Sequence, residues 1–298
     1  RQMCIRDSVW VVCVFCDFLK KLCASLFSTL CVGNLWGLVW ESIPLGAFPF
    51  IPSAAVLQVQ VYFQFRFFAF SFSAEVQAKS VSKNKEVVDV IFILDRSGSM
   101  GGLESDTIGG FNSVLEKQRK EEGKAYITTV LFDDQYELLH DRVDITKVKN
   151  ITEKEYYVRG STALLDAIGK TIAKEKAIQD TLPKGEKATK VLFIIITDGL
   201  ENASKEYNSA TVKRLIETQK EKYGWEFLFL GANIDAIETA SAIGISAERA
   251  VNYNSDSVGT QLNYKSLNNA VSEVRSGKEL KKEWKADIEA DYQQRNKK

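Results

Sequence analysis

Two apolar runs, residues 87–94 and 191–196, are the clearest pattern in this chain, and Asp89 is the one charged residue within them. Both runs are rich in Val and Ile and end at a short polar turn, which is typical of strands buried on both faces of a parallel sheet. Shorter runs predict further strands at residues 125–132, 136–143, 225–230 and 250–253. The pattern therefore predicts six strands.

Helical patterns separate most of these strands. Apolar residues recur three and four positions apart near residues 107–122, 163–181, 211–223 and 236–243, which predicts helices there. Because only residues 133–135 lie between the second and third strands, we expect a hairpin in which the third strand is antiparallel. This alternation predicts an α/β fold, a doubly wound, mostly parallel six-stranded sheet with helices on both faces.

The chain ends in a charged region with a regular apolar stripe. Leu280, Trp284, Ile288 and Tyr292 recur every fourth residue, so they would share one face of a helix. Residues 257–298 are accordingly expected to form a helical extension. Two interpretations stay open: the helix packs on its own domain, or Leu280, Trp284 and Ile288 form a partner-binding surface that lies in a groove of another protein.

Oxygen-bearing side chains follow the two longest apolar runs. Asp95, Ser97 and Ser99 come directly after the first run, Asp198 follows the second, and Thr162 precedes a predicted helix. The carboxyl ends of strands are where open α/β sheets place their ligands. Carboxylate and hydroxyl oxygens suit a hard cation, so we predict a site for Mg²⁺ or Mn²⁺.

Each of these five residues also has an ordinary structural alternative. Asp95, Thr162 and Asp198 could cap the segments that follow them, and Ser97 and Ser99 could be turn residues. The occurrence of all five in this order favours the metal site. Gly101-Gly102 and Gly109-Gly110 form no phosphate-binding loop, because no Gly-Lys-Ser/Thr follows them.

The pattern Asp95-x-Ser97-x-Ser99, then Thr162, then Asp198-Gly199 resembles the metal-ion-dependent adhesion site of von Willebrand factor type A (VWA) domains. The resemblance covers roughly residues 86–254 and includes all five motif positions. Residues 231–236 are similar to those of small bacterial stand-alone members. The resemblance implies a VWA domain at residues 81–256 with strand order 3-2-1-4-5-6. It also implies a metal held partly through water and completed by a Glu or Asp of a partner protein.

The resemblance further implies a protein-binding module, since bacterial relatives are frequently partners of AAA-type ATPases. We expect no enzymatic activity: His140 is the only histidine, no nucleophile elbow Gly-x-Ser-x-Gly is present, and no cysteine follows Cys31. Mg²⁺-dependent hydrolysis is kept as an alternative. Residues 81–298 carry 33 basic and 35 acidic side chains, which gives no reason to expect a nucleic-acid partner.

Residues 1–80 have a different composition from the rest of the chain. They contain all five cysteines, 11 of 17 Phe and only 10 of 78 charged residues. One interpretation is that these residues are translated from non-native DNA, because residues 1–7 are encoded by CGTCAGATGTGTATAAGAGAC, a string that resembles a sequencing-library adapter. Translation of the native protein would then start at Val81. The alternatives are a secretory signal or a membrane anchor, since residues 22–40 carry no charge.

These interpretations determine the expected location of the protein. With a start at Val81 we expect a cytoplasmic protein without a membrane contact. If residues 1–80 are native, the chain is expected to be membrane-anchored or secreted, and it could then act as a cell-surface adhesin.

Overall fold

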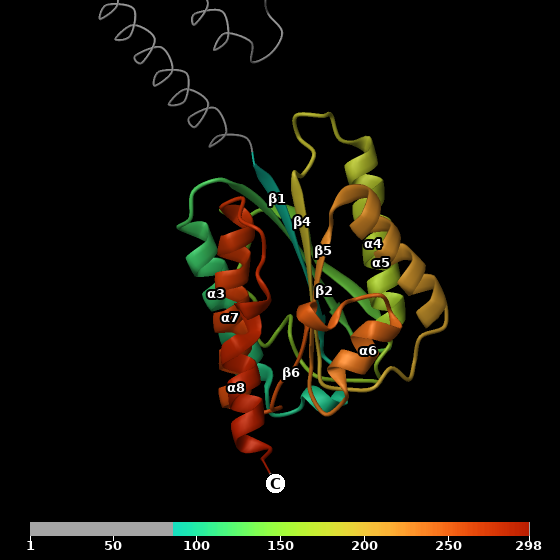
Figure 1. The fold of residues 1–298 in the computed structure, drawn as a ribbon, viewed down its shortest axis with the longest axis vertical. Coiled ribbons are helices and arrows are strands. Elements are labelled where there is room, and N and C mark those ends of the chain that lie inside the picture. The colour runs from blue at the N-terminus through green and yellow to red at the C-terminus, as the bar shows by residue number, and fades with distance from the viewer. Residues whose placement is uncertain (1–85, 298) are drawn as a thin grey trace, which may run out of the picture. The chain divides into compact units, whose positions relative to one another are not determined.

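The computed structural model describes residues 86–297, which contain a six-stranded sheet (Figure 1). The strand order is β3-β2-β1-β4-β5-β6; β2 and β3 pair antiparallel and all other neighbours pair parallel. The strands are β1 (Val87–Asp95), β2 (Lys124–Phe132), β3 (Tyr136–Asp144), β4 (Lys190–Thr197), β5 (Glu226–Gly231) and β6 (Ala250–Asn252). The predicted fold class and strand order are confirmed.

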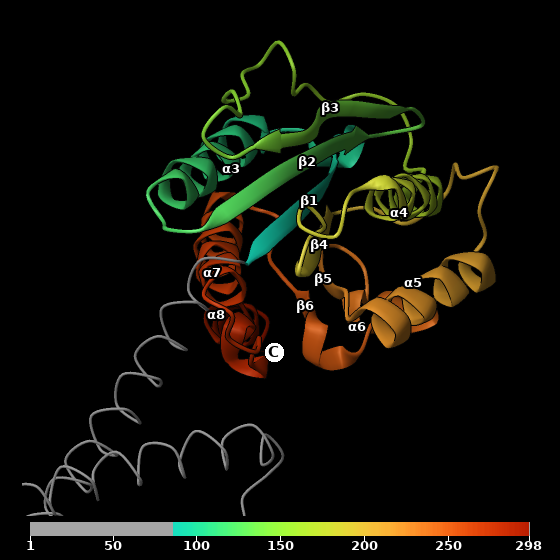
Figure 2. The same ribbon diagram turned by 90° about the horizontal axis from the view of Figure 1, so that it is seen from above.

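Helices cover both faces of the sheet, as Figure 2 shows from above. One layer contains α3, α7 and α8, and the other contains α4, α5 and α6. Their bounds are α3 (Glu104–Arg119), α4 (Leu164–Thr181), α5 (Ser209–Tyr223), α6 (Ala236–Ala242), α7 (Ser257–Arg275) and α8 (Ala286–Arg295). Short 3₁₀ helices occupy Gly98–Met100, Ala247–Arg249 and Lys282–Lys285.

The central strand β1 shows why the apolar runs are continuous. Val90 and Phe92 face the layer of α3 and α7, whereas Ile91 and Ile93 face the layer of α4 and α5. All four side chains are inaccessible to solvent. Successive side chains of a strand point to opposite faces, so a strand between two helical layers needs apolar residues at nearly every position.

Helix α7 lies in the expected helical extension but ahead of its apolar stripe, and it completes one layer by packing along α3. Polar side chains on its buried face obscure its periodicity: Asn263, Ser266 and Asn268 are all buried. Gln118 of α3 donates from Nε2 to Asn268 Oδ1 at 2.9 Å, so the polar groups pair between the two helices. A hydropathy pattern alone reads such positions as exposed.

The C-terminal apolar stripe is packed within the chain itself. Leu280, Trp284 and Ile288 are 3%, 8% and 1% exposed and belong to the apolar cluster that contains β1 and α3. Trp284 also donates from Nε1 to the carbonyl oxygen of Glu248 at 3.0 Å. This corrects the docking interpretation, because the three side chains face the chain's own core and present no apolar surface to a partner.

The stripe is also not a single helix. Helix α7 ends at Arg275, Gly277 adopts a positive φ of 73°, and a 3₁₀ helix precedes α8.

The interpretations of residues 1–80 and the start at Val81 fall outside the described residues. Within residues 86–297, no helix is both long and apolar enough to cross a membrane.

Candidate metal centre

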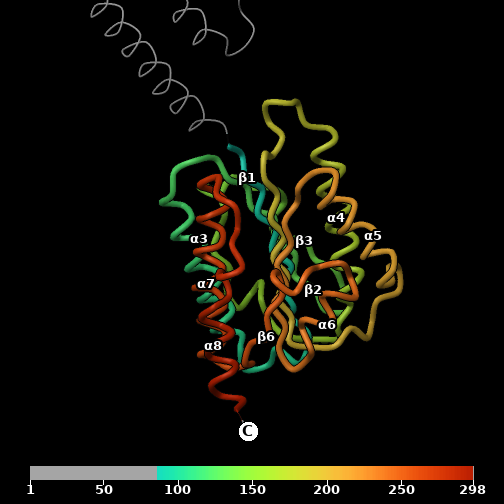
Figure 3. Tube along the Cα trace, in the orientation of Figure 1, coloured from blue at the N-terminus to red at the C-terminus, as the bar shows by residue number. Residues whose placement is uncertain are grey.

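The five predicted residues lie at the edge of the sheet where the parallel strands end. Asp95 is the last residue of β1, and Ser97 and Ser99 follow it in the turn before α3. Asp198 comes directly after β4, and Thr162 precedes α4 by two residues. The loops that carry them can be followed along the chain trace in Figure 3. We use the name metal centre for Asp95, Ser97, Ser99, Thr162 and Asp198.

Three hydroxyl groups converge on one point beside Gly199. Ser97 Oγ and Ser99 Oγ are 3.0 Å apart. A methyl group placed on the Cα of Gly199 would lie 2.9 Å from Ser99 Oγ, 3.1 Å from Thr162 Oγ1 and 3.8 Å from Ser97 Oγ. The structure thus brings together hydroxyls from two loops that are far apart in the sequence.

Asp95 is held in a fixed orientation. Its Oδ1 accepts a hydrogen bond from the backbone N of Ser97 at 2.7 Å, and its Oδ2 accepts one from Thr197 Oγ1 at 2.5 Å. Tyr156 fixes the backbone at the same point by donating to the Asp95 carbonyl oxygen at 2.5 Å. Because both carboxylate oxygens already accept hydrogen bonds, Asp95 suits an indirect role through water.

One carboxylate oxygen of Asp198 is available to a ligand. Its Oδ2 accepts a hydrogen bond from Ser255 Oγ at 3.2 Å, but its Oδ1 is buried and has no hydrogen-bond partner among the described residues. A buried carboxylate oxygen without a partner is costly, so such an atom in a polar site points to a bound group. A cation among the hydroxyls would satisfy it.

Burial affects the protonation of both carboxylates. Burial raises the pKa of Asp95 to about 6, against the lowering effect of hydrogen bonds from Thr197 and Ser97, and the charge of Asp198 adds to the rise. Burial also raises the pKa of Asp198 above its ordinary value. Two negative charges in a dry site are unfavourable by themselves, and a divalent cation would neutralise them.

The segment after Asp198 positions Thr162. The backbone N of Thr162 donates to Asn202 Oδ1 at 2.9 Å, and the Thr162 carbonyl oxygen accepts from the backbone N of Asn202 at 3.0 Å. Glu201 Oε2 accepts from the backbone N of Leu165 in the first turn of α4 at 2.9 Å. Sequence reasoning missed Glu201 and Asn202; their one signal was a polar stretch that begins at Glu201, three residues after Asp198.

A buried charge cluster joins the other two loops. Asp133, which is fully buried, accepts from Arg96 Nε at 3.1 Å and from Arg159 Nε at 2.5 Å. The backbone N of Gly98 donates to the Gly160 carbonyl oxygen at 3.2 Å. These contacts tie the loop of Ser97 to the loop of Thr162. The sequence had assigned Asp133 only to a hairpin turn.

The donor set fits a hard divalent cation. Carboxylate and hydroxyl oxygens are the ligand types that Mg²⁺ and Mn²⁺ accept. Within the described part of the chain, no three His, Cys, Asp or Glu side chains gather as a metal-binding group, so hydroxyls must supply much of any shell. His140 Nδ1 lies 3.0 Å from Thr129 Oγ1, a contact within the β2–β3 pair rather than at the metal centre.

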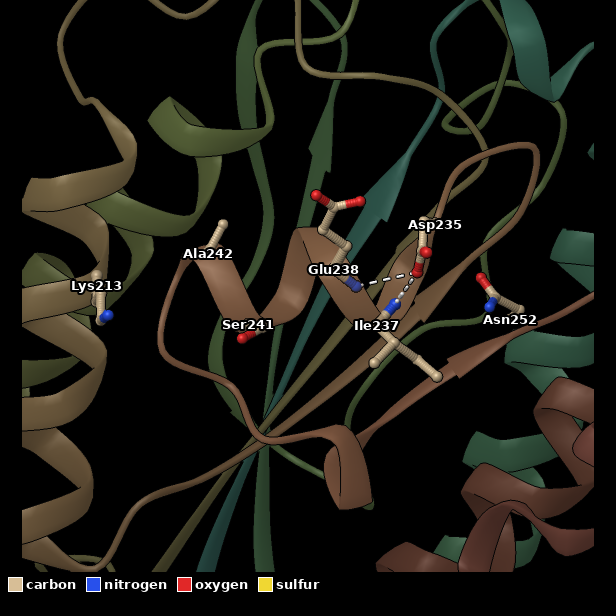
Figure 4. A pocket seen from close by; sticks show the side chains of 7 residues that line it. All are labelled: Lys213, Asp235, Ile237, Glu238, Ser241, Ala242 and Asn252. Atoms are coloured by element: carbon tan, nitrogen blue, oxygen red, sulfur yellow. Dashed lines mark hydrogen bonds between the residues drawn. The ribbon is translucent and has the colours of Figure 1, made fainter.

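A surface groove between α5 and α6 is a separate feature (Figure 4). Two of its polar side chains are engaged in capping α6: Asp235 Oδ1 accepts from the backbone N of Ile237 and Glu238, and Asn252 Oδ1 accepts from the backbone N of Ala236. It is lined by Lys213, Asp235, Ile237, Glu238, Ser241, Ala242 and Asn252. The metal centre is therefore the stronger candidate site.

No protein-family model and no curated protein matches this chain, but solved structures do. The pilus adhesin SpaC from Lactobacillus rhamnosus GG matches with a TM-score of 0.50 and 12% identity, over 64% of this chain and 31% of that chain. A von Willebrand factor type A structure from Catenulispora acidiphila gives a TM-score of 0.44 and 18% identity, over 63% and 43% of the two chains.

Proximal thread matrix protein 1 from the mussel byssus, with a zinc-occupied MIDAS motif, gives a TM-score of 0.43 and 16% identity, over 63% of this chain and 46% of that chain. This chain spans less than two thirds of the length of each of these three structures. At such identities the likeness concerns the fold alone. With its observed strand order, the chain has the predicted doubly wound α/β fold, and the likeness to SpaC concerns this fold.

Proposed function

We propose that this protein is a divalent-metal-dependent protein-binding module that engages an acidic residue of a partner protein. The observation that carries the proposal is the buried, unpartnered Asp198 Oδ1 beside three hydroxyls that converge at Gly199. Mg²⁺ is the cation we propose, because it accepts an all-oxygen shell. Mn²⁺ takes the same ligands and serves as a probe.

The chain's own residues leave room for an outside ligand. Ser97 and Thr162 are buried, whereas Ser99 is exposed and opens the site to solvent. Ser97, Ser99 and Thr162 are neutral, so they do not cancel the cation's charge. When bound, Mg²⁺ would supply a positive centre to which a carboxylate from a partner is attracted.

Binding is favoured over catalysis by the same donor set. Metal-assisted hydrolysis requires groups that activate and orient water, and carboxylate or imidazole side chains usually do so. Both oxygens of Asp95 already accept hydrogen bonds, so Asp95 is poorly placed to act as a general base. We therefore propose a non-enzymatic role. An AAA-type ATPase is the partner class that the family resemblance supports.

A pull-down with the full chain tests this function. The bait is incubated with lysate of the source organism in Mg²⁺ and in EDTA, and the Asp198→Ala variant is run alongside. Asp180→Ala, which removes an exposed aspartate on α4, is the matched control. A protein retained in Mg²⁺ by the wild type and Asp180→Ala, but lost in EDTA and with Asp198→Ala, supports the proposal. The same retained proteins in every lane would contradict it.

A further inference from the structure

Most of the large apolar side chains on the surface belong to the sheet edge that carries the metal centre. Residues 86–297 leave five of them exposed: Tyr157, Leu200, Tyr223, Ile237 and Val258. Single exposed apolar residues are ordinary, so those that adjoin residues of a candidate site are the informative ones. Four of the five belong to loops or helix starts at the edge of the sheet that carries the metal centre. Tyr223, at the end of α5, belongs to the opposite edge.

Leu200 and Val258 adjoin Asp198 most directly. Leu200 is 66% exposed and follows Gly199, the residue on which the three hydroxyls converge. Val258 is 55% exposed and begins α7, just after Ser255, whose hydroxyl donates to Asp198 Oδ2 at 3.2 Å. Both exposed side chains therefore belong to segments that contact the metal centre, through Gly199 and Ser255.

The exposed residues nearest to Ser99 and Thr162 in the chain are small: Gly98, Gly101, Gly102, Gly160 and Ser161. Polar side chains adjoin two of them, Asp134 at Gly160 and Glu104 at Gly102. These small residues offer a ligand no large apolar side chain, so Leu200 and Val258 are the apolar contacts we consider.

Charges around this edge limit the kind of ligand. Asp106 accepts from Ser257 Oγ at 2.8 Å, and Asp256 accepts from the backbone N of Gly259, so both acidic groups lie at the start of α7. Glu104 accepts from the backbone N of Gly102 at 2.7 Å. Asp256 is paired with Arg295, and Arg159 is partly exposed in the loop of Thr162, so charges of both signs surround the site. A single carboxylate with uncharged neighbours avoids repulsion from Glu104 and Asp106, whereas a run of acidic residues does not.

We propose that the partner presents one Asp or Glu with a bulky apolar side chain beside it, and that this apolar side chain packs on Leu200 and Val258. The inference rests on the proposed metal-dependent function and adds the chemical class of the binding segment. The carboxylate enters the metal centre, and burial of the exposed leucine and valine adds affinity and selects the neighbouring residue.

Random peptides displayed on phage are the probe. They are selected on the full chain in Mg²⁺ and released with EDTA. The expected consensus is one acidic residue with Leu, Ile, Met, Phe, Tyr or Trp within two positions. Acidic peptides without an apolar preference would overturn the inference and leave the proposed function standing. If EDTA releases no enriched peptide, both fail.

Variants of the exposed residues sharpen the test. With a synthetic peptide of the consensus, Leu200→Ser is expected to weaken binding about tenfold. The free energy gained by burying a leucine side chain corresponds to about this change in affinity. Leu200→Met should retain the affinity. Tyr223→Ser, at a residue 51% exposed on the opposite edge, is the matched control and should change nothing. Mg²⁺ affinity without peptide should be equal in all variants. Equal peptide affinity of Leu200→Ser and wild type would overturn the inference.

Discussion

At Gly199 the missing side chain is what keeps the metal centre open. We predict that Gly199→Ala lowers the affinity for Mg²⁺ by about tenfold or more, because a methyl group would lie 2.9 Å from Ser99 Oγ and 3.1 Å from Thr162 Oγ1, inside the space a cation needs. The φ of Gly199 is not positive, so alanine strains no backbone. Calorimetric titration of the metal-free protein measures the effect.

The matched control is Gly109→Ala in α3, where an added methyl group meets nothing within 4 Å. It should leave metal affinity unchanged and stabilise the protein by about 0.5–1 kcal/mol, since glycine is unfavourable inside a helix. Equal metal affinity of Gly199→Ala and wild type would show that the cation does not bind where the hydroxyls converge.

Asp95 makes metal binding dependent on pH. Its pKa is about 6 in the folded, metal-free protein and ordinarily 3.8, so protons compete with the cation below about pH 6. We predict that Mn²⁺ affinity falls by up to about tenfold for each pH unit below that value. Titrations from pH 7.5 to about pH 5 measure this, and an affinity that does not change over the range would contradict it. Asp95→Asn should bind weakly at every pH.

The Asp95 carboxyl also affects folding stability. Whereas metal affinity rises with pH, the stability of the metal-free protein falls. A raised pKa in the folded state means that the folded protein binds the proton more tightly than the unfolded chain does. In EDTA, the stability that Asp95 contributes is therefore fully present below its ordinary pKa of 3.8 and is lost as pH rises through about 6. The change is on the order of 3 kcal/mol at neutral pH, and bound metal offsets it.

Among single residues, those that follow a strongly patterned element could be predicted from the sequence. Asp95 and Asp198 each end a buried strand, so the sheet edge brings them together whatever the details of the loops. Asn202 and Ser255 could not be predicted, because their contacts depend on loop conformations without a periodic pattern. Thr197, which directly follows the second apolar run, was not assigned to the site, although it bonds directly to Asp95.

Helix α4 contacts β1 through a buried pair of carboxyl groups. Gln179 Nε2 donates to Asp89 Oδ2 at 2.6 Å and to Glu175 Oε1 at 2.7 Å, and Arg142 Nε donates to Asp89 Oδ2 at 2.8 Å. Burial and then the charge of Asp89 raise the pKa of Glu175 to about 7. A protonated Glu175 therefore stabilises this contact near neutral pH.

We predict that the unfolding free energy of the wild type falls as pH rises from the ordinary Glu175 pKa of 4.5 through about 7, because the buried proton is lost. Glu175→Gln carries no such proton and should be more stable than wild type above pH 8 by on the order of 1 kcal/mol. Urea unfolding at pH 5, 7 and about 8.5 measures this. The exposed Glu221→Gln on α5 is the control, and parallel pH curves for wild type and Glu175→Gln would contradict the account.

The C-terminal elements belong to the core. We predict that Trp284→Ala lowers the unfolding free energy by about 3–5 kcal/mol, because it removes a buried aromatic side chain and its hydrogen bond to Glu248. Tyr292→Ala, at a half-buried position of α8, should cost about 1 kcal/mol. Chemical denaturation measures both. Equally small losses would restore the interpretation of a detachable partner-binding helix.

Elements whose apolar residues follow a single spacing could be predicted from the sequence. Elements with polar residues on the buried face could not. The bounds of β1, β2, β3 and β4 agree with the sequence prediction to within one residue at each end. The C-terminal stripe gave the correct apolar face but the wrong continuity, since Leu280 precedes the 3₁₀ helix, Trp284 lies within it and Ile288 lies in α8. The spacing of apolar residues reveals which of them share a face, but it does not reveal where the backbone leaves the helical conformation.

At the scale of the described domain, the core and the metal centre are separate. The apolar residues of β1 and β4 fill two layers between sheet and helices, whereas the metal centre lies where these strands end (Figure 1). Substitutions at the metal centre should therefore change binding and leave the fold intact. This separation allows metal affinity to be changed by substitution without loss of the fold.

We propose that Asp198 and its neighbouring hydroxyls hold a divalent cation. The most direct test is titration of Mg²⁺ into the EDTA-treated, dialysed full chain and its Asp198→Ala variant, with urea unfolding of both in EDTA. The account predicts saturable binding by the wild type, an affinity at least about tenfold lower for the variant, and equally cooperative unfolding of the two proteins. Absence of saturable binding by the wild type, or equal affinity of both proteins, would contradict it.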